Sequence, residues 1–107
     1  MAAYCASKAG VTHLTKSVAL DCAARGLQIR ANTVHPGAIR TPMYERYVNA
    51  GGATPEEIET VMASAHPMGR VGTPEEVAKA IIFLSCDDSS FTSGTDLNID
   101  GASAIRE

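Results

Sequence analysis

The sequence predicts an α/β fold: the C-terminal part of a doubly wound parallel sheet, in the order helix, strand, helices, helix, strand. Three observations lead to this expectation. A long helical pattern opens the chain, a short β-branched stretch stops at Pro36-Gly37, and residues 96–100 alternate between polar and apolar side chains. A strand, a helical crossover and a second strand form a right-handed parallel unit almost by default. Two such strands need neighbours, so we expect residues 1–107 to form part of a larger domain whose first half is absent.

The first helix is expected from Ala3 to Ala24, with Gly26 placed to take the left-handed conformation that ends it. Tyr4 and Lys8 lie one turn apart near its start and point the same way, because helical side chains lean toward the N-terminus. Gly10 is expected to mark close packing against another backbone. At about 100° per residue, one stripe of this helix holds Tyr4, Lys8, Val11, Thr15, Val18 and Cys22.

Two strands are expected. The first covers Leu27–Val34, which is partly β-branched and stops at Pro36-Gly37. In open parallel sheets, ligands bind beyond the carboxyl ends of the strands, and Gly37 would let the backbone approach a ligand closely. An ordinary loop-forming turn is the alternative that these residues alone leave open. The second strand covers Asp96–Asp100, with Leu97 and Ile99 on its buried face.

Two of the helices expected between the strands begin with capping motifs. A short helix is expected over residues 43–48. Thr54-Pro55-Glu56-Glu57 then supplies an N-cap, a proline at the first helical position and a glutamate at the third, which together form a capping box. The same start returns at Thr73-Pro74-Glu75-Glu76, before a helix that ends near Cys86. The expected apolar faces of these two helices comprise Ile58, Val61, Met62 and Ala65, and Val77, Ala80, Ile81 and Leu84.

Composition excludes several classes of protein. The chain is 45% hydrophobic and 20% charged, with a net charge of -3 and no basic cluster, so nucleic acid is not an expected partner. No apolar run approaches the roughly 18 residues of a membrane span, and the N-terminus does not resemble a signal peptide. We therefore expect a cytoplasmic protein without a membrane partner. The spacing of Cys5, Cys22 and Cys86 fits no metal or redox motif, which favours reduced, buried thiols and no metal.

The Tyr4 and Lys8 pair suggests acid–base chemistry. A free phenol loses its proton at about pH 10, and a neighbouring cation favours the phenolate. An acid or base works better when its pKa lies closer to the working pH. Tyrosine and lysine four residues apart are nevertheless common on helices, so this spacing alone decides little.

Four longer segments carry more information. They read YCASKAGV at residues 4–11, IRANTVHPGAIRTPM at 29–43, PMGRVGTPEEVA at 67–78 and SGTDLNIDG at 93–101. In this order they resemble the second half of the classical short-chain dehydrogenases/reductases. The resemblance covers nearly the whole chain. It implies part of a Rossmann-type domain that binds NAD or NADP, in a homo-oligomeric oxidoreductase whose small-molecule substrate is a secondary alcohol or a ketone.

The resemblance also implies roles for single residues. In this family the tyrosine exchanges the proton of the substrate oxygen while hydride passes to or from nicotinamide, a role that falls on Tyr4. The lysine makes the phenol more acidic and hydrogen-bonds the nicotinamide ribose, so both tasks fall on Lys8. The remaining cofactor-binding positions are Pro36, Gly37, Ile39 (through its backbone) and Thr41. Expected walls of the substrate pocket are Met43, Tyr44 and Tyr47.

The family's glycine-rich pyrophosphate turn, catalytic serine and upstream asparagine do not occur in these residues. We therefore expect a truncated product or gene fragment of a nicotinamide-dependent oxidoreductase. The alternative function is that of a catalytically incompetent fragment that acts only through protein–protein association, using the edge of its first strand and the stripe of its first helix. A freestanding helical binding module is a third possibility, supported by composition alone.

Overall fold

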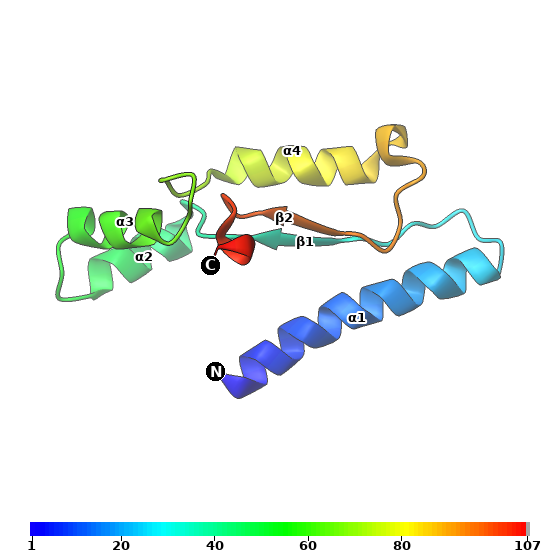
Figure 1. Ribbon diagram of the computed structural model, residues 1–107, viewed down its shortest axis with the longest axis horizontal. Helices are drawn as coiled ribbons and strands as arrows, with labels where there is room; N and C mark the ends of the chain where they lie inside the picture. Colours follow the sequence, from blue (N-terminus) through cyan, green and yellow to red (C-terminus); the bar gives the residue numbers. More distant parts are fainter. Residues whose placement is uncertain (107) are drawn as a thin grey trace. The chain divides into compact units, whose positions relative to one another are not determined.

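The computed structural model describes residues 1–106, and Figure 1 shows the order of its elements. The helices are α1 (Ala2–Ala24), α2 (Pro42–Ala50), α3 (Pro55–Ser64) and α4 (Pro74–Ser85), the strands are β1 (Thr33–Pro36) and β2 (Asp96–Ile99), and short 3-10 helices cover Asp87–Ser89 and Ser103–Ile105. The backbone divides into two compact units. The first comprises residues 1–34 and 82–97, and the second comprises residues 35–81 and those from 98 onward.

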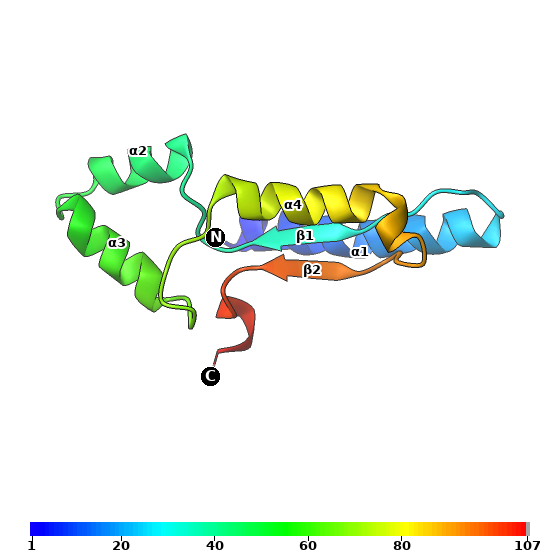
Figure 2. The ribbon, with the colours of Figure 1, turned by 90° about the horizontal axis from the view of Figure 1, so that it is seen from above.

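The two strands pair in parallel and lie side by side in both ribbon views (Figures 1 and 2). The Thr33 N–H donates to the Thr95 carbonyl at 2.9 Å, and the Gly37 N–H donates to the Ile99 carbonyl at 3.0 Å. Both bonds have the same residue offset, as a parallel ladder requires. Burial alternates along β2 as its sequence predicts. The predicted α/β class is confirmed.

The first strand begins later than predicted, because β1 is Thr33–Pro36 and not Leu27–Val34. Its ladder donors are alternate residues, Thr33 and Gly37 among them. Pro36 therefore places its missing N–H on the edge away from β2, where proline does not interrupt the ladder.

The residues before β1 are held mainly by side chains, together with one backbone bond from the Gly94 N–H to the Ala31 carbonyl at 2.7 Å. The Arg30 guanidinium donates to Ser89 Oγ at 2.9 Å and to the carbonyls of Cys86 and Thr92 at 3.1 and 3.2 Å. Bonds from a charged guanidinium are among the stronger hydrogen bonds in proteins. This fork ties the segment before β1 to the turn after α4.

Helix α1 has almost its predicted bounds, and Gly26 has the left-handed φ of 66° that was expected at its end. Its apolar stripe is largely exposed, with Tyr4 60% and Val11 57% accessible. A Cβ added at Gly10 would meet nothing within 4 Å among the described residues, so the expected close packing against another backbone is not found within residues 1–106. Cys22 is buried, but Cys5 lies on the exposed part of this helix, which corrects the expectation that all three thiols are buried.

Each unit has a small core of its own. The first buries Ala19 and Cys22 of α1 and the polar side chains of Thr33 and Ser89; the second buries Val48, Val71 and His66. Across residues 1–106, none of the helices combines the length and apolarity that crossing a membrane requires.

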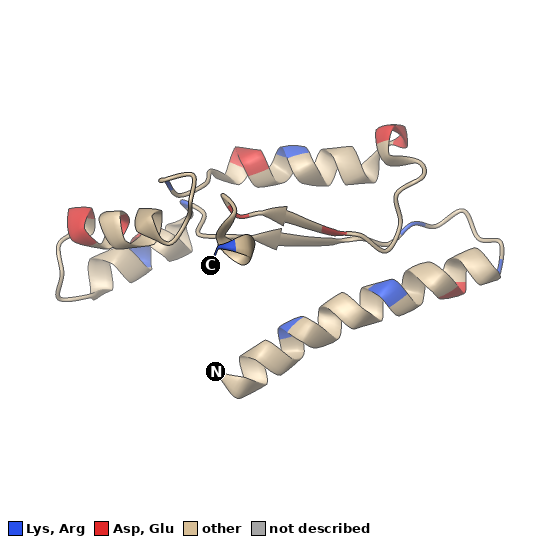
Figure 3. Ribbon diagram, viewed as in Figure 1, with Lys and Arg blue, Asp and Glu red and all other residues tan. Residues whose placement is uncertain are grey.

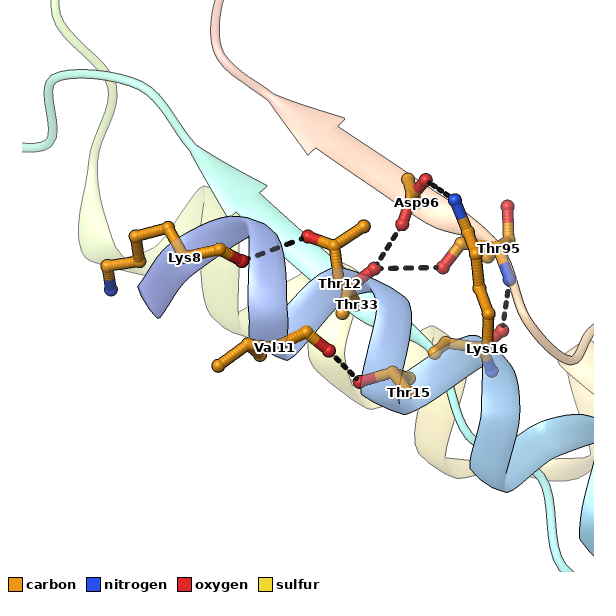
Figure 4. Close-up of polar contacts among 9 residues, drawn as sticks. Lys8, Val11, Thr12, Thr15, Lys16, Thr33, Thr95 and Asp96 are labelled. Atoms are coloured by element: carbon orange, nitrogen blue, oxygen red, sulfur yellow. Dashed lines mark hydrogen bonds and ion pairs between the residues drawn. The ribbon is translucent and has the colours of Figure 1, made fainter. Parts of the chain in front are cut away.

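A polar network joins α1 to the start of the strands (Figure 4). Lys16 Nζ pairs with one carboxylate oxygen of Asp96 at 2.5 Å, and the other oxygen accepts the hydroxyl of buried Thr33. The Lys16 and Asp96 side chains are 40% and 33% exposed, so solvent screens their attraction. The hydrogen bond from Thr33 is better shielded, because Thr33 is buried.

We expect Asp96→Ala to lower the free energy of unfolding by about 1.5–3 kcal/mol, because it removes a charged acceptor from a buried hydroxyl. Lys16→Ala removes only the screened ion pair and should cost at most about 1 kcal/mol. Urea denaturation of the full chain measures both values. Equal losses in the two variants would show that the ion pair, and not the Thr33 bond, carries the stabilisation.

The helix starts of the second unit are as predicted. At α3, the Thr54 N–H donates to the Glu57 carboxylate at 2.8 Å, and the Glu57 N–H donates to Thr54 Oγ1 at 3.3 Å. Thr73 and Glu76 make the same reciprocal pair at α4, at 2.9 and 3.4 Å. Acidic side chains gather at the first turns of both helices (Figure 3), where they complement the helix dipole. The short helix expected at 43–48 forms as α2.

The carboxylate of Glu76 also pairs with Arg70, at 2.6 and 3.0 Å. These bonds, followed by the bond from the Thr73 N–H, lower the pKa of Glu76 from 4.5 to about 2. Because the pKa is lower in the folded state, the stabilisation is present at neutral pH and is lost as the pH falls through about 2.

A carboxyl-detected NMR titration of Glu76 should show this low pKa. Arg70→Gln should raise the pKa of Glu76 toward 4.5, because it removes the charged hydrogen bonds from Arg70 that lower this pKa most. Thr73→Ala should raise it less, because the backbone N–H of residue 73 remains. A pKa of Glu76 that does not change in Arg70→Gln would contradict this account.

Candidate active site

Tyr4 and Lys8 lie on the first two turns of α1, within the first unit. The Lys8 ammonium lies over the face of the Tyr4 ring, 5.5 Å from its centroid, which is within the range of a cation–π interaction. The two side chains thus share one face, as their spacing predicts. Tyr4 is 60% exposed, so a ligand can reach the phenol.

The second unit contains an apolar cleft of about 660 Å³. One wall comes from the turn after β1 and from α2, and it comprises Pro36, Gly37, Ile39, Thr41, Met43, Tyr44 and Tyr47. These are all the predicted cofactor and substrate positions except Lys8. Lys8 and Tyr4 belong to the first unit and are not among the lining residues. The other wall comes from α4, through Pro74, Val77, Ala78 and Ile81.

The α4 wall was not assigned to the site from the sequence. Val77 and Ile81 were assigned only to the apolar face of a helix, and that periodicity is the same for a core face and for a cleft wall. In the structure Val77 is half-buried and Ile81 is 48% exposed. The apolar periodicity of α4 was therefore present in the sequence, but it did not show whether this face lies in a core or lines a cleft.

The turn after β1 is held against the start of the α4 segment. The Gly72 N–H donates to the Ala38 carbonyl and the Arg40 N–H donates to the Gly72 carbonyl, both at 2.9 Å. Ile39 therefore forms a parallel bridge with Gly72, and its own amide and carbonyl point to the opposite side. The backbone N–H and C=O of Ile39 are therefore not used in the bridge to Gly72.

Gly37 is required by a contact within the protein. A Cβ at this position would lie 2.7 Å from His66 Nε2 and 2.9 Å from the Asp100 Cα. Real Cβ atoms do not approach other atoms so closely. The sequence predicted a close approach of Gly37 to a ligand, whereas the structure shows that it approaches the buried His66 ring and the end of β2.

Helix α2 begins after Thr41, a cap that was not predicted from the sequence. Thr41 Oγ1 accepts the Tyr44 N–H at 3.2 Å, and Pro42 occupies the first helical position. The Tyr44 hydroxyl donates to Glu59 of α3 at 2.9 Å, and Glu59 also pairs with Arg40. Burial, followed by the hydrogen bond and charge of Glu59, raises the pKa of Tyr44. Tyr44 is therefore a neutral phenol. It contributes its ring to the wall of the cleft and does not act as an acid there.

The cleft suits an uncharged, largely apolar ligand. None of the lining side chains carries a charge, and two of its polar groups, the hydroxyls of Thr41 and Tyr44, already have partners. Its volume lies in the range of roughly 300–1,000 Å³ that is typical of small-molecule sites. A nicotinamide ring and an uncharged substrate fit such a surface. Within residues 1–106, no three His, Cys, Asp or Glu side chains lie close enough together to hold a metal ion.

The parallel strands, their helical crossover and the cleft beyond β1 define part of a doubly wound α/β domain, a fold in which ligand sites lie at the strand ends. The sequence profile described as Enoyl-(Acyl carrier protein) reductase matches residues 1–102. The chain belongs to the short-chain dehydrogenase/reductase family.

Known relatives agree with this assignment. A cyclohexanol dehydrogenase of Acinetobacter sp. (strain SE19) is 48% identical over 92% of this chain, and an NADP-dependent (R)-specific alcohol dehydrogenase of Lentilactobacillus kefiri is 38% identical over 94%. The chain spans 35% and 38% of the length of these two curated relatives. A solved short chain dehydrogenase family protein of Francisella tularensis subsp. tularensis SCHU S4 superposes with a TM-score of 0.86 at 37% identity, over 97% of this chain and 44% of that one.

Proposed function

We propose that this chain supplies the acid–base pair and the nicotinamide end of the cofactor site in an oxidoreductase that interconverts a secondary alcohol and a ketone with NAD or NADP. The observation that carries this proposal is the cleft of the second unit. Seven residues to which the resemblance gives cofactor or substrate roles, from two different elements, line one apolar surface.

In this proposal Tyr4 exchanges a proton with the substrate oxygen. Lys8, whose ammonium lies over the Tyr4 ring, hydrogen-bonds the cofactor ribose. Bound NAD or NADP supplies or accepts the hydride. Pro36 and Thr41 lie on either side of the nicotinamide position. The backbone of Ile39 hydrogen-bonds the polar group of the nicotinamide.

The substrate lies against the remaining part of the cleft. Met43, Tyr47 and the ring of Tyr44 form its wall on the α2 side. The names of two relatives, a cyclohexanol dehydrogenase and an NADP-dependent alcohol dehydrogenase, support an alcohol as substrate and a nicotinamide as cofactor.

A fluorescence titration of the full chain with NADPH and NADH tests the proposal. We expect saturable binding that is lost in Val77→Asp, which places a charge in the apolar wall, and retained in Lys79→Ala on the same helix. Circular dichroism checks that both variants remain helical. No change in cofactor fluorescence at millimolar concentration would refute catalytic competence of this chain.

We propose association with other chains as the second candidate function, because α1 exposes large apolar side chains. Val11, Leu14 and Leu20 are 57%, 65% and 73% exposed. Apolar groups gathered on one helix are typical of protein interfaces. Light scattering coupled to size-exclusion chromatography should show a homo-oligomer that Leu14→Glu dissociates. A monodisperse monomer of the unmodified chain would contradict this function.

A further inference from the structure

We propose that His66 is a positioning residue of the cofactor site: its neutral imidazole holds the turn after β1 in the conformation that forms the cleft. This inference rests on the proposed function for its link to the cofactor. Its structural part, that His66 holds the turn, concerns this chain alone. No role was assigned to His66 from the sequence.

The ring is buried and has a partner at each nitrogen. Only 7% of His66 is exposed. Its Nε2 lies 3.0 Å from the backbone nitrogen of Ala38, and its Nδ1 lies 2.7 Å from the Met62 carbonyl oxygen. An amide N–H can only donate and a carbonyl can only accept, so Nδ1 carries the hydrogen and Nε2 accepts. Both partners thus select the same neutral tautomer.

The backbone that carries this ring is also fixed. The His66 N–H donates to the Ala63 carbonyl at 3.0 Å, and the Gly69 N–H donates to the His66 carbonyl at 2.7 Å. The neighbouring Met68 N–H donates to the Gly101 carbonyl at 3.2 Å. The end of α3 and the end of β2 therefore support the ring, which can position the turn only because its own base is held.

Ala38 connects His66 to the cleft. His66 Nε2 holds its amide, and the Gly72 N–H holds its carbonyl at 2.9 Å. With both groups fixed, the orientation of the next peptide, which carries the amide of Ile39, is set. Ile39 lines the cleft, so a change at Ala38 is transmitted to the surface proposed for nicotinamide.

Gly37 makes the arrangement possible. The His66 ring fits beside the turn only because residue 37 has no side chain, since a Cβ there would lie 2.7 Å from Nε2. The glycine and the histidine are therefore a matched pair. The ring takes the space that the glycine leaves and uses it to accept the amide of Ala38.

Two substitutions of similar size separate positioning from packing. In His66→Gln the side-chain amide reaches about as far as Nε2, so its oxygen can still accept the Ala38 N–H. In His66→Asn it reaches only about as far as Nδ1, so it can donate to Met62 but not accept from Ala38. We therefore expect the Ala38 amide of the full chain to exchange with solvent about tenfold faster in His66→Asn than in His66→Gln, the effect of one lost hydrogen bond.

The NADPH dissociation constant is the second measurement. It should rise about tenfold in His66→Asn and remain near that of the unmodified chain in His66→Gln. Exchange at Val48, in the core of the second unit, serves as the control for general unfolding and should be the same in both variants.

Equal exchange at Ala38 in the two variants, or faster exchange at Ala38 and Val48 alike, would overturn the positioning role. Faster exchange at Ala38 with unchanged NADPH affinity would overturn its link to the cofactor. If the unmodified chain binds no cofactor, the proposed function and that link fail together, and the exchange comparison still decides whether His66 holds the turn.

Discussion

Under the proposed function, replacing Tyr4 by phenylalanine is expected to lower the rate of alcohol oxidation by about two to four orders of magnitude, the usual contribution of a general acid–base group. The change removes one oxygen and keeps the ring over which the Lys8 ammonium lies. Tyr4 is 60% exposed, so the free energy of unfolding should hardly change. The loss should therefore appear in kcat while the cofactor affinity is retained.

The rate is followed by NADPH or NADH absorbance, with cyclohexanol and cyclohexanone as probes, on chain shown by titration to bind cofactor. Ser7→Ala is the matched control, because its hydroxyl donates to the Tyr4 carbonyl of the same helix, at 2.8 Å. This control should keep the full rate. A Tyr4→Phe chain that keeps more than a tenth of the rate would show that another group handles the proton.

Replacing Gly37 by alanine is expected to lower the free energy of unfolding by about 1–3 kcal/mol, the cost of forcing an extra methyl into a packed site. The added Cβ would lie 2.7 Å from His66 Nε2 and 2.9 Å from the Asp100 Cα. The histidine ring can move only by breaking its bond to Ala38, and Asp100 directly follows Ile99, whose carbonyl accepts the Gly37 N–H. Neither neighbour can therefore move away from the added methyl group without losing a hydrogen bond.

Urea denaturation measures the loss, and Gly10→Ala is the matched control. A Cβ at Gly10 would meet nothing within 4 Å, and alanine is the better helix former, so this variant should gain about 1 kcal/mol. The two glycine-to-alanine changes should thus have opposite signs. A Gly37→Ala chain as stable as the unmodified one would show that the turn can shift freely, and it would also weaken the role proposed for His66.

Helix starts could be predicted because their chemistry is local. Thr54 and Thr73 each precede a proline and stand three residues before a glutamate, and both form capping boxes. Thr41 caps α2 through its hydroxyl in the same way, but Tyr44 stands where the glutamate would be, so the box is incomplete and its cap was not predicted. The beginning of β1 was wrong because Arg30 bonds partners about 60 residues away, which no local pattern reveals.

The candidate site likewise contains residues that the sequence predicted and residues that it did not. The turn and the residues of α2 that line the cleft were named from the resemblance to a family, whose motifs are contiguous in sequence. Glu59 and His66 were not named, although one holds the Tyr44 hydroxyl and the other the Ala38 amide. Each acts on a residue 15 or 28 positions away, and neither lies in a motif of its own.

The sequence by itself determined the helices, the alternating strand and the family, because caps, periodicity and motifs depend on residues within a few positions of one another. Only the tertiary structure decided that α4 forms the second wall of the cleft, that Tyr44 gives its hydroxyl to Glu59, and that Gly37 leaves room for the ring of His66. These features depend on which distant segments meet. That is set by the packing of the whole unit and not by any single stretch of it.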